Sequence, residues 1–149
     1  MNILKPLQLL RQPLRVSLRS ISNKPAVNPK FRPLADDELT SVVLELVWRA
    51  TACNQRKKGV HEAKKTLYWR TSEFIVMAAD TDPTTILDPL ISLAREKKVP
   101  YVFVPSKIEL GGACKVNAAV AACSILTCEK SYIEGDVLTV KEAIINLSN

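Results

Sequence analysis

The stretch RKKGVHEAKKTLYWR, residues 56–70, concentrates side chains that could bind an anion. It holds six Lys and Arg residues and a single acid, Glu62. If a helix begins near Gly59, its free backbone N–H groups and its dipole favour an anion there. Lys65 follows Glu62 by three residues and His61 by four, so on a helix all three share an outward face. Three interpretations fit: a solvated face on which Glu62 pairs with a lysine, a generic phosphate-binding patch, or an RNA site in which Glu62 reads a base.

Residue sets that carry catalysis or bind metals are missing from the sequence. It contains no Gly-x-Gly-x-x-Gly, no phosphate loop and no Gly-x-Ser-x-Gly. His61 is the only histidine, and the four cysteines lack the spacing of zinc ligands. We therefore expect a noncatalytic protein without a metal or a cofactor. The cysteines are Cys53, Cys114, Cys123 and Cys128, and their apolar surroundings favour free thiols in a reducing compartment over two disulfides.

The net charge of +6 comes from the N-terminal part of the chain. Residues 1–35 contain seven cations and no acid, whereas residues 36–149 contain 14 cations and 15 acids. The main part of the chain is thus nearly neutral overall, and the cations of residues 56–70 polarise it. A local positive field of this kind favours a specific anionic partner.

The first 24 residues differ in pattern from the rest. Leucines and one isoleucine share one face of a helical wheel, arginines lie beside them, and acids are missing. This pattern is typical of an organelle transit peptide, although Pro13 would break the helix. The other interpretation is a basic arm with nonspecific affinity for nucleic acid. We divide the chain into an N-terminal extension, residues 1–26, that is disordered or serves targeting, and one domain, residues 27–149.

Helical and strand patterns alternate from residue 35 onward. Amphipathic patterns predict helices over residues 35–52, 59–67, 82–98, 106–114 and 137–147, and apolar runs predict strands over 73–79, 100–104 and 120–126. Asp82 is expected to cap the third helix, with Pro83 in its first turn. Strands separated by helices indicate an α/β fold, which we expect to be a three-layer α/β/α sandwich with a central, mostly mixed sheet. No apolar run approaches the roughly 20 residues of a membrane-spanning helix, so we expect no membrane partner.

Four segments resemble a known family in the same order. VNPKFRPLADDELT, RKKGVHEAKKTL, SEFIVMAADTDP and KKVPYVFVPSKIELGGAC are similar to the ribosomal-protein-like family of kink-turn RNA-binding proteins. That family includes spliceosomal and box C/D snoRNP core proteins, H/ACA snoRNP proteins and archaeal ribosomal proteins. The resemblance covers residues 27 to about 128. VNPK and FIVMAAD look most like the spliceosomal and box C/D members, whereas GV and PSKIELG look more like the H/ACA member.

The resemblance implies an RNA site with two walls. A kink-turn exposes guanine edges and extrudes a base, which fits the general recognition of irregular RNA elements. In the first wall Glu62 would accept hydrogen bonds from guanine, Lys65 would contact guanine or the backbone, and Lys58 with the Gly59 amide would hold phosphate. The full set of implied RNA-binding residues is Lys58, Gly59, Val60, His61, Glu62, Lys65, Asp82, Ile86, Val116 and Ala121. The last four form the second wall; helix capping by Asp82, core packing by Ile86 and loop packing by Val116 are the alternatives.

The chain departs from the family at several of these positions. His61 replaces an asparagine and lacks its paired amide groups, so the base contact must change. Ala118 replaces an arginine of the covering loop, and Arg70 replaces a glycine after the recognition helix. Tyr68 and Trp69 stand where the family has polar residues. They could be core residues, stack on RNA or form a protein interface.

The resemblance implies a noncatalytic RNA-binding subunit of a ribonucleoprotein, either the spliceosomal tri-snRNP, the box C/D snoRNP or both. It would recognise and stabilise kink-turn RNA and help to recruit partner proteins. The alternatives are an H/ACA snoRNP-type protein and a divergent scaffold for protein interactions. A nuclear and nucleolar location is implied, with a mitochondrial one if residues 1–24 act as a transit peptide.

Overall fold

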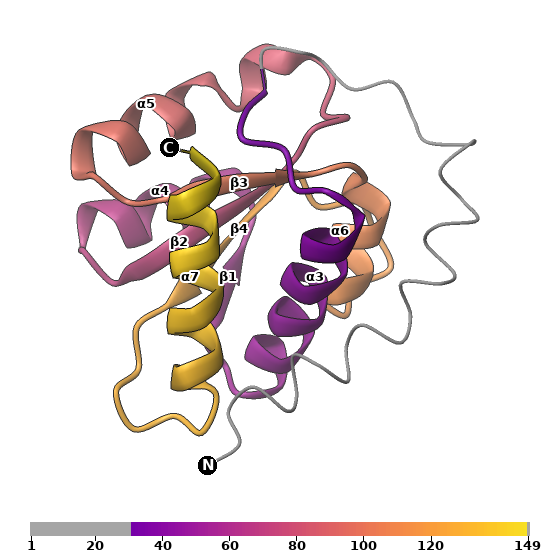
Figure 1. The fold of residues 1–149 in the computed structure, drawn as a ribbon. Helices are drawn as coiled ribbons and strands as arrows, with labels where there is room; N and C mark the ends of the chain where they lie inside the picture. Colours follow the sequence, from indigo (N-terminus) through magenta and orange to yellow (C-terminus); the bar gives the residue numbers. More distant parts are fainter. Residues whose placement is uncertain (1–30, 149) are drawn as a thin grey trace.

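Helices and strands alternate along the chain, and the strands form one central sheet (Figure 1). The computed structural model describes residues 31–148. The helices are α3 (Asp37–Ala52), α4 (Val60–Tyr68), α5 (Asp88–Lys97), α6 (Lys107–Ala113) and α7 (Glu134–Ser148), with a 3₁₀ turn η2 (Thr84–Ile86). The strands are β1 (Arg56–Lys58), β2 (Ser72–Ala78), β3 (Tyr101–Val104) and β4 (Ala122–Leu126). The order β1-β4-β2-β3 combines a parallel β2–β3 pair with antiparallel β1–β4 and β2–β4 pairs, so the sheet is mixed.

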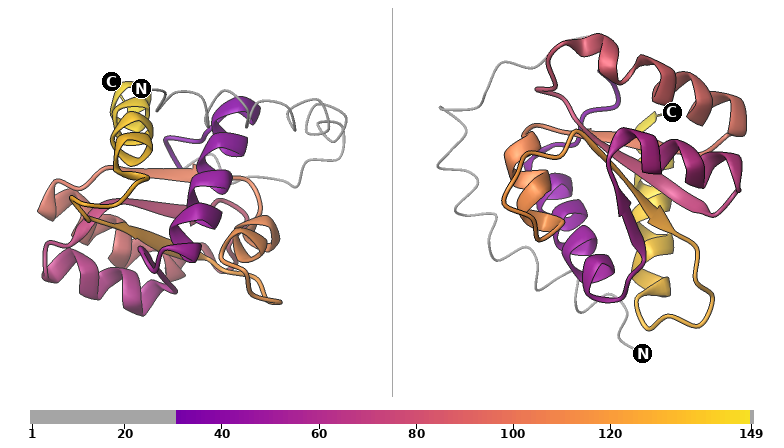
Figure 2. Two further views of the ribbon diagram at one scale, coloured as in Figure 1. Left: turned by 90° about the horizontal axis from the view of Figure 1, so that it is seen from below. Right: turned by 180° about the vertical axis from the view of Figure 1, so that it is seen from behind.

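Two apolar clusters cover the two faces of the sheet. Successive side chains of a strand point to opposite faces, and β2 is buried on both. Phe74 and Val76 belong to a cluster with residues of α3, α6 and α7, whereas Ile75 and Met77 pack with residues of α4 and α5. The predicted three-layer α/β/α sandwich is therefore confirmed (Figure 2).

Local capping explains where two of the helices begin. The Asp36 carboxylate accepts a hydrogen bond from the Leu39 N–H at 2.8 Å and caps α3. The Ser106 hydroxyl accepts one from the Glu109 N–H at 3.1 Å and caps α6. Both side chains satisfy backbone donors that have no partner within the helix.

The helix predicted over residues 82–98 is wrong in its first part. The α5 helix begins at Asp88, and residues Thr84–Ile86 form the separate turn η2. Asp82 is therefore not the helix cap. A helix continuing from Asp82 would place Pro89 in its interior, where proline lacks the required N–H and clashes with the preceding turn. Pro89 lies instead in the first turn of α5, a position that suits it.

The segment before α3 covers the edge of the sheet at β3. The Phe31 ring stacks on Phe103 with centroids 4.6 Å apart, and Leu34 forms a parallel bridge to Phe103. Phe31 is buried, so the folded part of the chain already includes it. The predicted domain boundary between residues 26 and 27 lies outside the described residues. Within residues 31–148, no helix is long and apolar enough to cross a membrane.

Candidate nucleic-acid interface

The strand ends bring several predicted site residues to one edge of the sheet. Strands β1, β2 and β3 end at this edge and β4 begins there. The Gly59 N–H donates to the Ala122 carbonyl at 2.7 Å, and the Ala78 N–H donates to the Ala121 carbonyl at 2.8 Å. These two bonds fix the start of α4 beside the segment that leads into β4.

A hollow of about 290 Å³ lies at this junction. It is lined by Lys58, Gly59, Val60, Val116, Ala118, Ala119, Val120 and Ala121. Five of the ten predicted site residues therefore surround one space. A larger hollow of about 500 Å³ lies beside Arg32, Tyr101 and Leu147 and contains none of the predicted residues.

Gly59 turns the chain from β1 into α4. Its φ of 100° is a conformation that residues with a side chain rarely adopt. Contrary to the expectation that the Gly59 amide holds phosphate, its N–H is already bonded to Ala122. No side chain caps α4, so the N–H groups of its first turn, Val60 and His61 among them, are the donors available to an anion.

The first two turns of α4 present the predicted base-reading residues to solvent. Glu62 Oε2 lies 3.4 Å from Lys65 Nζ, and their side chains are 44% and 45% exposed. His61 is also exposed. An exposed pair of this type is worth only about 0.3–0.5 kcal/mol. The Glu62–Lys65 pair of the solvated interpretation thus exists, but it is weak enough for an RNA hydrogen bond to replace it.

Asp82 and Ile86 do not line the hollow. Both side chains are exposed, and Ile86 belongs to η2. The alternative that Ile86 is a core residue is excluded, because 42% of its surface is exposed. Leu87, directly after η2, is buried in the cluster against which Val60 and Ala121 also pack. The η2 turn and the hollow are therefore attached to the same apolar cluster.

Two features of the site were not predicted from the sequence. The Gly111 Cα faces the Ala118 carbonyl so closely that a side chain at residue 111 would overlap it. Arg56 donates to the Cys114 carbonyl at 2.7 Å and to the Thr51 hydroxyl at 3.0 Å, so it ties the ends of α6 and α3 together rather than facing an anion freely. A glycine inside a helical pattern was the one available signal for the first contact, since such glycines often mark close packing.

Two thiols lie beneath the cations of β1. All four cysteines are free, and Cys114 and Cys123 are buried. A hydrogen bond from the Cys123 thiol, helped by the charges of Arg56 and Lys58, lowers the pKa of Cys114 against the opposing effect of burial. The same hydrogen bond and full burial raise the pKa of Cys123. Cys123 pairs with Lys58 across the β1–β4 ladder, so one of the two thiols lies on the strand next to the cations.

Buried hydroxyl groups join α4 to the sheet. The Thr66 hydroxyl lies 2.8 Å from that of Ser124, which lies 2.7 Å from that of Ser72. Thr66 and Ser124 are buried. Buried polar groups that are fully paired in this way fix the packing of neighbouring elements, so they hold the exposed face of α4 in place.

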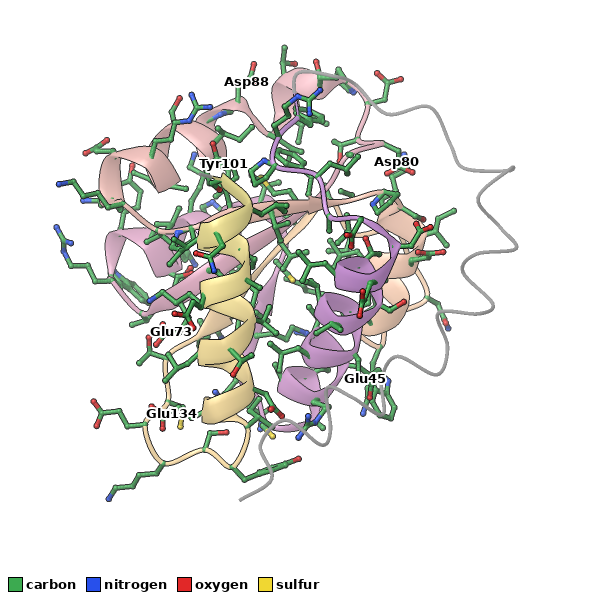
Figure 3. The ribbon with its side chains drawn as sticks, viewed as in Figure 1. Glu45, Glu73, Asp80, Asp88, Tyr101 and Glu134 are labelled. Atoms are coloured by element: carbon green, nitrogen blue, oxygen red, sulfur yellow. The ribbon has the colours of Figure 1, made fainter. Side chains whose placement is uncertain are left out.

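The far end of α4 exposes two aromatic side chains. Tyr68 is 60% exposed and Trp69 is 72% exposed, which excludes the core interpretation for both. The Lys97 ammonium lies 5.7 Å from the centroid of the Tyr68 ring. On the left of Figure 3, side chains with nitrogen ends extend outward from α4 and α5.

The described residues offer groups that can bind an anion. Among residues 31–148, no group of three or more His, Cys, Asp or Glu side chains could hold a metal ion. Asp80, at the end of β2, accepts a hydrogen bond from the Lys107 N–H at 2.9 Å and so anchors α6. Exposed cations, free helix N–H groups and a partly exposed carboxylate are what the site offers a ligand.

Comparisons with known proteins agree with the fold and with the resemblance. Residues 42–134 match the model of the ribosomal protein L7Ae/L30e/S12e/Gadd45 family. The chain is 49% identical over 122 residues to the 13 kDa ribonucleoprotein-associated protein of Saccharomyces cerevisiae, covering 82% of this chain and 97% of that protein. It is 47% identical over 124 residues to NHP2-like protein 1 of Xenopus laevis, covering 83% and 97% respectively.

A solved structure shows the same fold. The Giardia lamblia 15.5kD RNA binding protein superposes with a TM-score of 0.77 at 31% identity, over 81% of this chain and 99% of that one. The family resemblance drawn from the four sequence segments is confirmed by these matches. The chain therefore belongs to the ribosomal protein L7Ae/L30e/S12e/Gadd45 family.

Proposed function

We propose that this chain is a noncatalytic RNA-binding subunit of a ribonucleoprotein, which recognises and stabilises kink-turn RNA and helps to recruit partner proteins. The names of its relatives support the general part of this proposal, since one is a ribonucleoprotein-associated protein and another an RNA binding protein. For the assembly we propose the spliceosomal tri-snRNP, the box C/D snoRNP or both. That choice rests on the resemblance of VNPK and FIVMAAD to the spliceosomal and box C/D members of the family.

The observation that carries the proposal is the position of Glu62 at the start of α4. Its carboxylate is partly exposed, bound only weakly to Lys65, and placed one turn from the hollow that Lys58 lines. A carboxylate can accept hydrogen bonds from the N–H groups of a guanine edge, which phosphate-binding cations alone cannot read. Lys58, Lys65 and the uncapped N–H groups of α4 would offset the phosphate charge nearby.

Replacing Glu62 tests the base-reading role. Glu62→Ala is expected to weaken binding to kink-turn RNA about 10- to 100-fold, because a hydrogen bond to a charged group is lost. Binding to a straight duplex of the same length should change little, since phosphate contacts dominate there. Electrophoretic shift or fluorescence anisotropy at one fixed salt concentration would measure both affinities.

Glu142→Ala is the matched control for this experiment. Glu142 is an exposed acid on α7, which packs on the face of the sheet opposite to α4, and its loss removes the same charge. It should leave the preference for kink-turn RNA unchanged. An equal effect of Glu62→Ala on kink-turn and duplex RNA would contradict the role of Glu62.

A protein-interaction scaffold is the second candidate function, because two departures from the family fall at the site. Ala118 lines the hollow where the family resemblance implies an arginine, and His61 is exposed beside Glu62. A scaffold would bind kink-turn RNA no better than an unrelated competitor duplex. An H/ACA snoRNP-type protein would retain RNA binding in a different assembly, so sequencing of crosslinked RNA would separate the two assemblies.

We further propose a nuclear and nucleolar location, with a mitochondrial one as the alternative. The basic pattern of residues 1–24 is the reason for that alternative. Fluorescent fusions of the whole chain and of a chain without residues 1–24 would distinguish them. Mitochondrial fluorescence that depends on the first 24 residues would overturn the nuclear proposal.

A further inference from the structure

We propose that the RNA-binding surface continues along α4 to an aromatic platform at its far end, where Trp69 stacks on an unpaired base of a single-stranded segment that leaves the kink. The platform consists of Tyr68, Trp69 and Arg70 together with Lys97 and Lys98 at the end of α5. The proposal rests on the proposed function and deepens it, because it adds a second element of the same RNA ligand.

The helical spacing places the platform in line with the base-reading residues. Lys65 follows Glu62 by three residues and Trp69 follows it by seven, so the three lie along one side of α4. His61 and Tyr68 are likewise seven residues apart. With a rise of 1.5 Å per residue, Trp69 lies about 10 Å beyond Glu62 along the helix axis. A strand that passes the first turn of α4 can therefore reach the aromatic end along a continuous exposed surface.

The exposed aromatic rings have the chemistry of a stacking site. Trp69 exposes 72% of its surface and Tyr68 exposes 60%, although both follow Leu67, which is fully buried. The Lys97 ammonium lies over the Tyr68 ring at 5.7 Å and so holds a cation beside the platform. Aromatic rings next to cations are the usual means by which proteins bind single-stranded nucleic acid, since every base has a face that can stack.

The charges around the platform are complementary to a phosphate backbone. Residues 60–70 and 95–98 together carry the cations Lys64, Lys65, Arg70, Arg95, Lys97 and Lys98, opposed within these segments by Glu62 and Glu96 alone. Arg95 is engaged with the Tyr101 hydroxyl at 2.9 Å. Within the described part of the chain, Arg70 and Lys98 form no ion pair, and both are exposed. These two cations are thus available to phosphate.

Both of these cations have an unusual backbone conformation. Arg70 has a φ of 58° and Lys98 a φ of 61°, so both occupy the left-handed region that favours glycine. Each follows the end of a helix, where a cation also interacts favourably with the helix dipole. The dipole accounts for positive charge at these positions, but it does not account for the exposed indole ring next to Arg70. Base stacking on that ring would account for its exposure.

An extended RNA tests the platform separately from the kink site. One probe is a blunt-ended kink-turn duplex, and the others carry six unpaired uridines on the 5′ or the 3′ end of a strand. We expect one extension to raise the affinity of the whole chain about tenfold, the order of magnitude of one base stacked on an aromatic ring. Trp69→Ala should abolish that gain and leave the affinity for the blunt duplex unchanged.

Matched variants distinguish this inference from the proposed function. Tyr132→Ala removes another exposed aromatic ring, outside α4 and α5, and should keep the full gain. Glu62→Ala should weaken all probes and yet preserve the ratio between extended and blunt RNA. Equal affinity of the unaltered chain for all probes, or an unchanged gain in Trp69→Ala, would overturn the platform while leaving the kink site intact. Failure of the blunt duplex to bind at all would overturn both.

Two further measurements report on the mechanism. In a Trp48→Phe background Trp69 is the remaining tryptophan, and stacking should quench its fluorescence with the extended probe but not with the blunt one. Arg70→Gly should reduce the gain about two- to fivefold by loss of one phosphate contact. Since glycine suits a φ of 58°, this variant should remain folded, so its loss of affinity would not reflect unfolding. Quenching of equal size by both probes would contradict stacking.

Discussion

Two neighbouring glycines in α6 have opposite surroundings. A side chain at residue 111 would overlap the Ala118 carbonyl, whereas nothing lies within 4 Å of the corresponding position at Gly112. We expect Gly111→Ala to push the segment around Ala118 away from α6 and to lower the free energy of unfolding by about 1–3 kcal/mol, as overpacking does. RNA affinity should fall as well, because Ala118 lines the hollow.

Gly112→Ala is the internal control for that variant. Alanine is a better helix former than glycine by about 0.8–1.0 kcal/mol, so this variant should be at least as stable as the unaltered chain. Urea unfolding followed by circular dichroism would compare the two. Equal stability of the two variants would show that the Gly111–Ala118 approach is not a packing constraint.

At the level of residues, the sequence predicts what local periodicity determines. The outward positions of His61, Glu62 and Lys65 follow from helical spacing, and the structure confirms them. The overlap of Gly111 with Ala118 and the engagement of the Gly59 amide could not be predicted, because each depends on a partner in another segment. Whether the ten predicted residues contact RNA stays a prediction.

The position of α4 on the sheet depends on buried hydroxyl groups. Thr66→Val keeps the shape of the side chain but removes the hydroxyl that lies 2.8 Å from Ser124. The Ser124 hydroxyl, which is fully buried, then loses one of its partners. We expect the free energy of unfolding to fall by about 1–3 kcal/mol. Chemical denaturation measures it, and the exposed Thr85→Val should have little effect by comparison.

At the level of elements, segments with an amphipathic or apolar pattern were predictable, and a segment without one was not. The helices α3, α4, α6 and α7 and the apolar strands β2, β3 and β4 lie where the patterns predict them. Strand β1 was missed because its three residues, Arg-Lys-Lys, are cationic and have no apolar pattern. The start of α5 was misplaced because the segment has two Asp-Pro pairs, and the second one, Asp88-Pro89, opens the helix.

An ion pair between distant segments holds two helices of one layer together. Arg49 of α3 lies 2.7 Å from the carboxylate of Asp136 on α7, and Asp136 is 3% exposed. The other oxygen of Asp136 has no hydrogen-bond partner within the described residues. Arg49→Ala would leave a buried carboxylate without its cation. We expect a loss of about 3 kcal/mol in the free energy of unfolding, the usual result when one partner of a buried pair is removed.

The exposed Glu62–Lys65 pair provides the contrast for that variant. Glu62→Ala should change the free energy of unfolding by less than about 1 kcal/mol, because both side chains are solvated. Thermal unfolding of the two variants under the same conditions would compare them. A similar loss in both would mean that burial does not determine the strength of the Arg49–Asp136 pair.

At the level of the whole molecule, the layers were predictable but the links between them were not. Apolar strands between amphipathic helices require a sheet covered on both faces, and this is what the structure has. Arg49 and Asp136 are 87 residues apart in the chain, and no local pattern connects them. No local pattern connects Phe31 with Phe103 either, although their rings stack.

The sheet has unequal borders, and this affects how its cations can be altered. The outer side of β3 is covered by the segment around Leu34, whereas β1 forms the opposite border with Lys57 and Lys58 exposed on it. Lysine on a border strand discourages pairing with a second molecule. Replacing both lysines with neutral residues to weaken RNA binding would therefore also favour self-association through β1. The sedimentation of such a variant should be measured before a loss of affinity is attributed to the RNA contact.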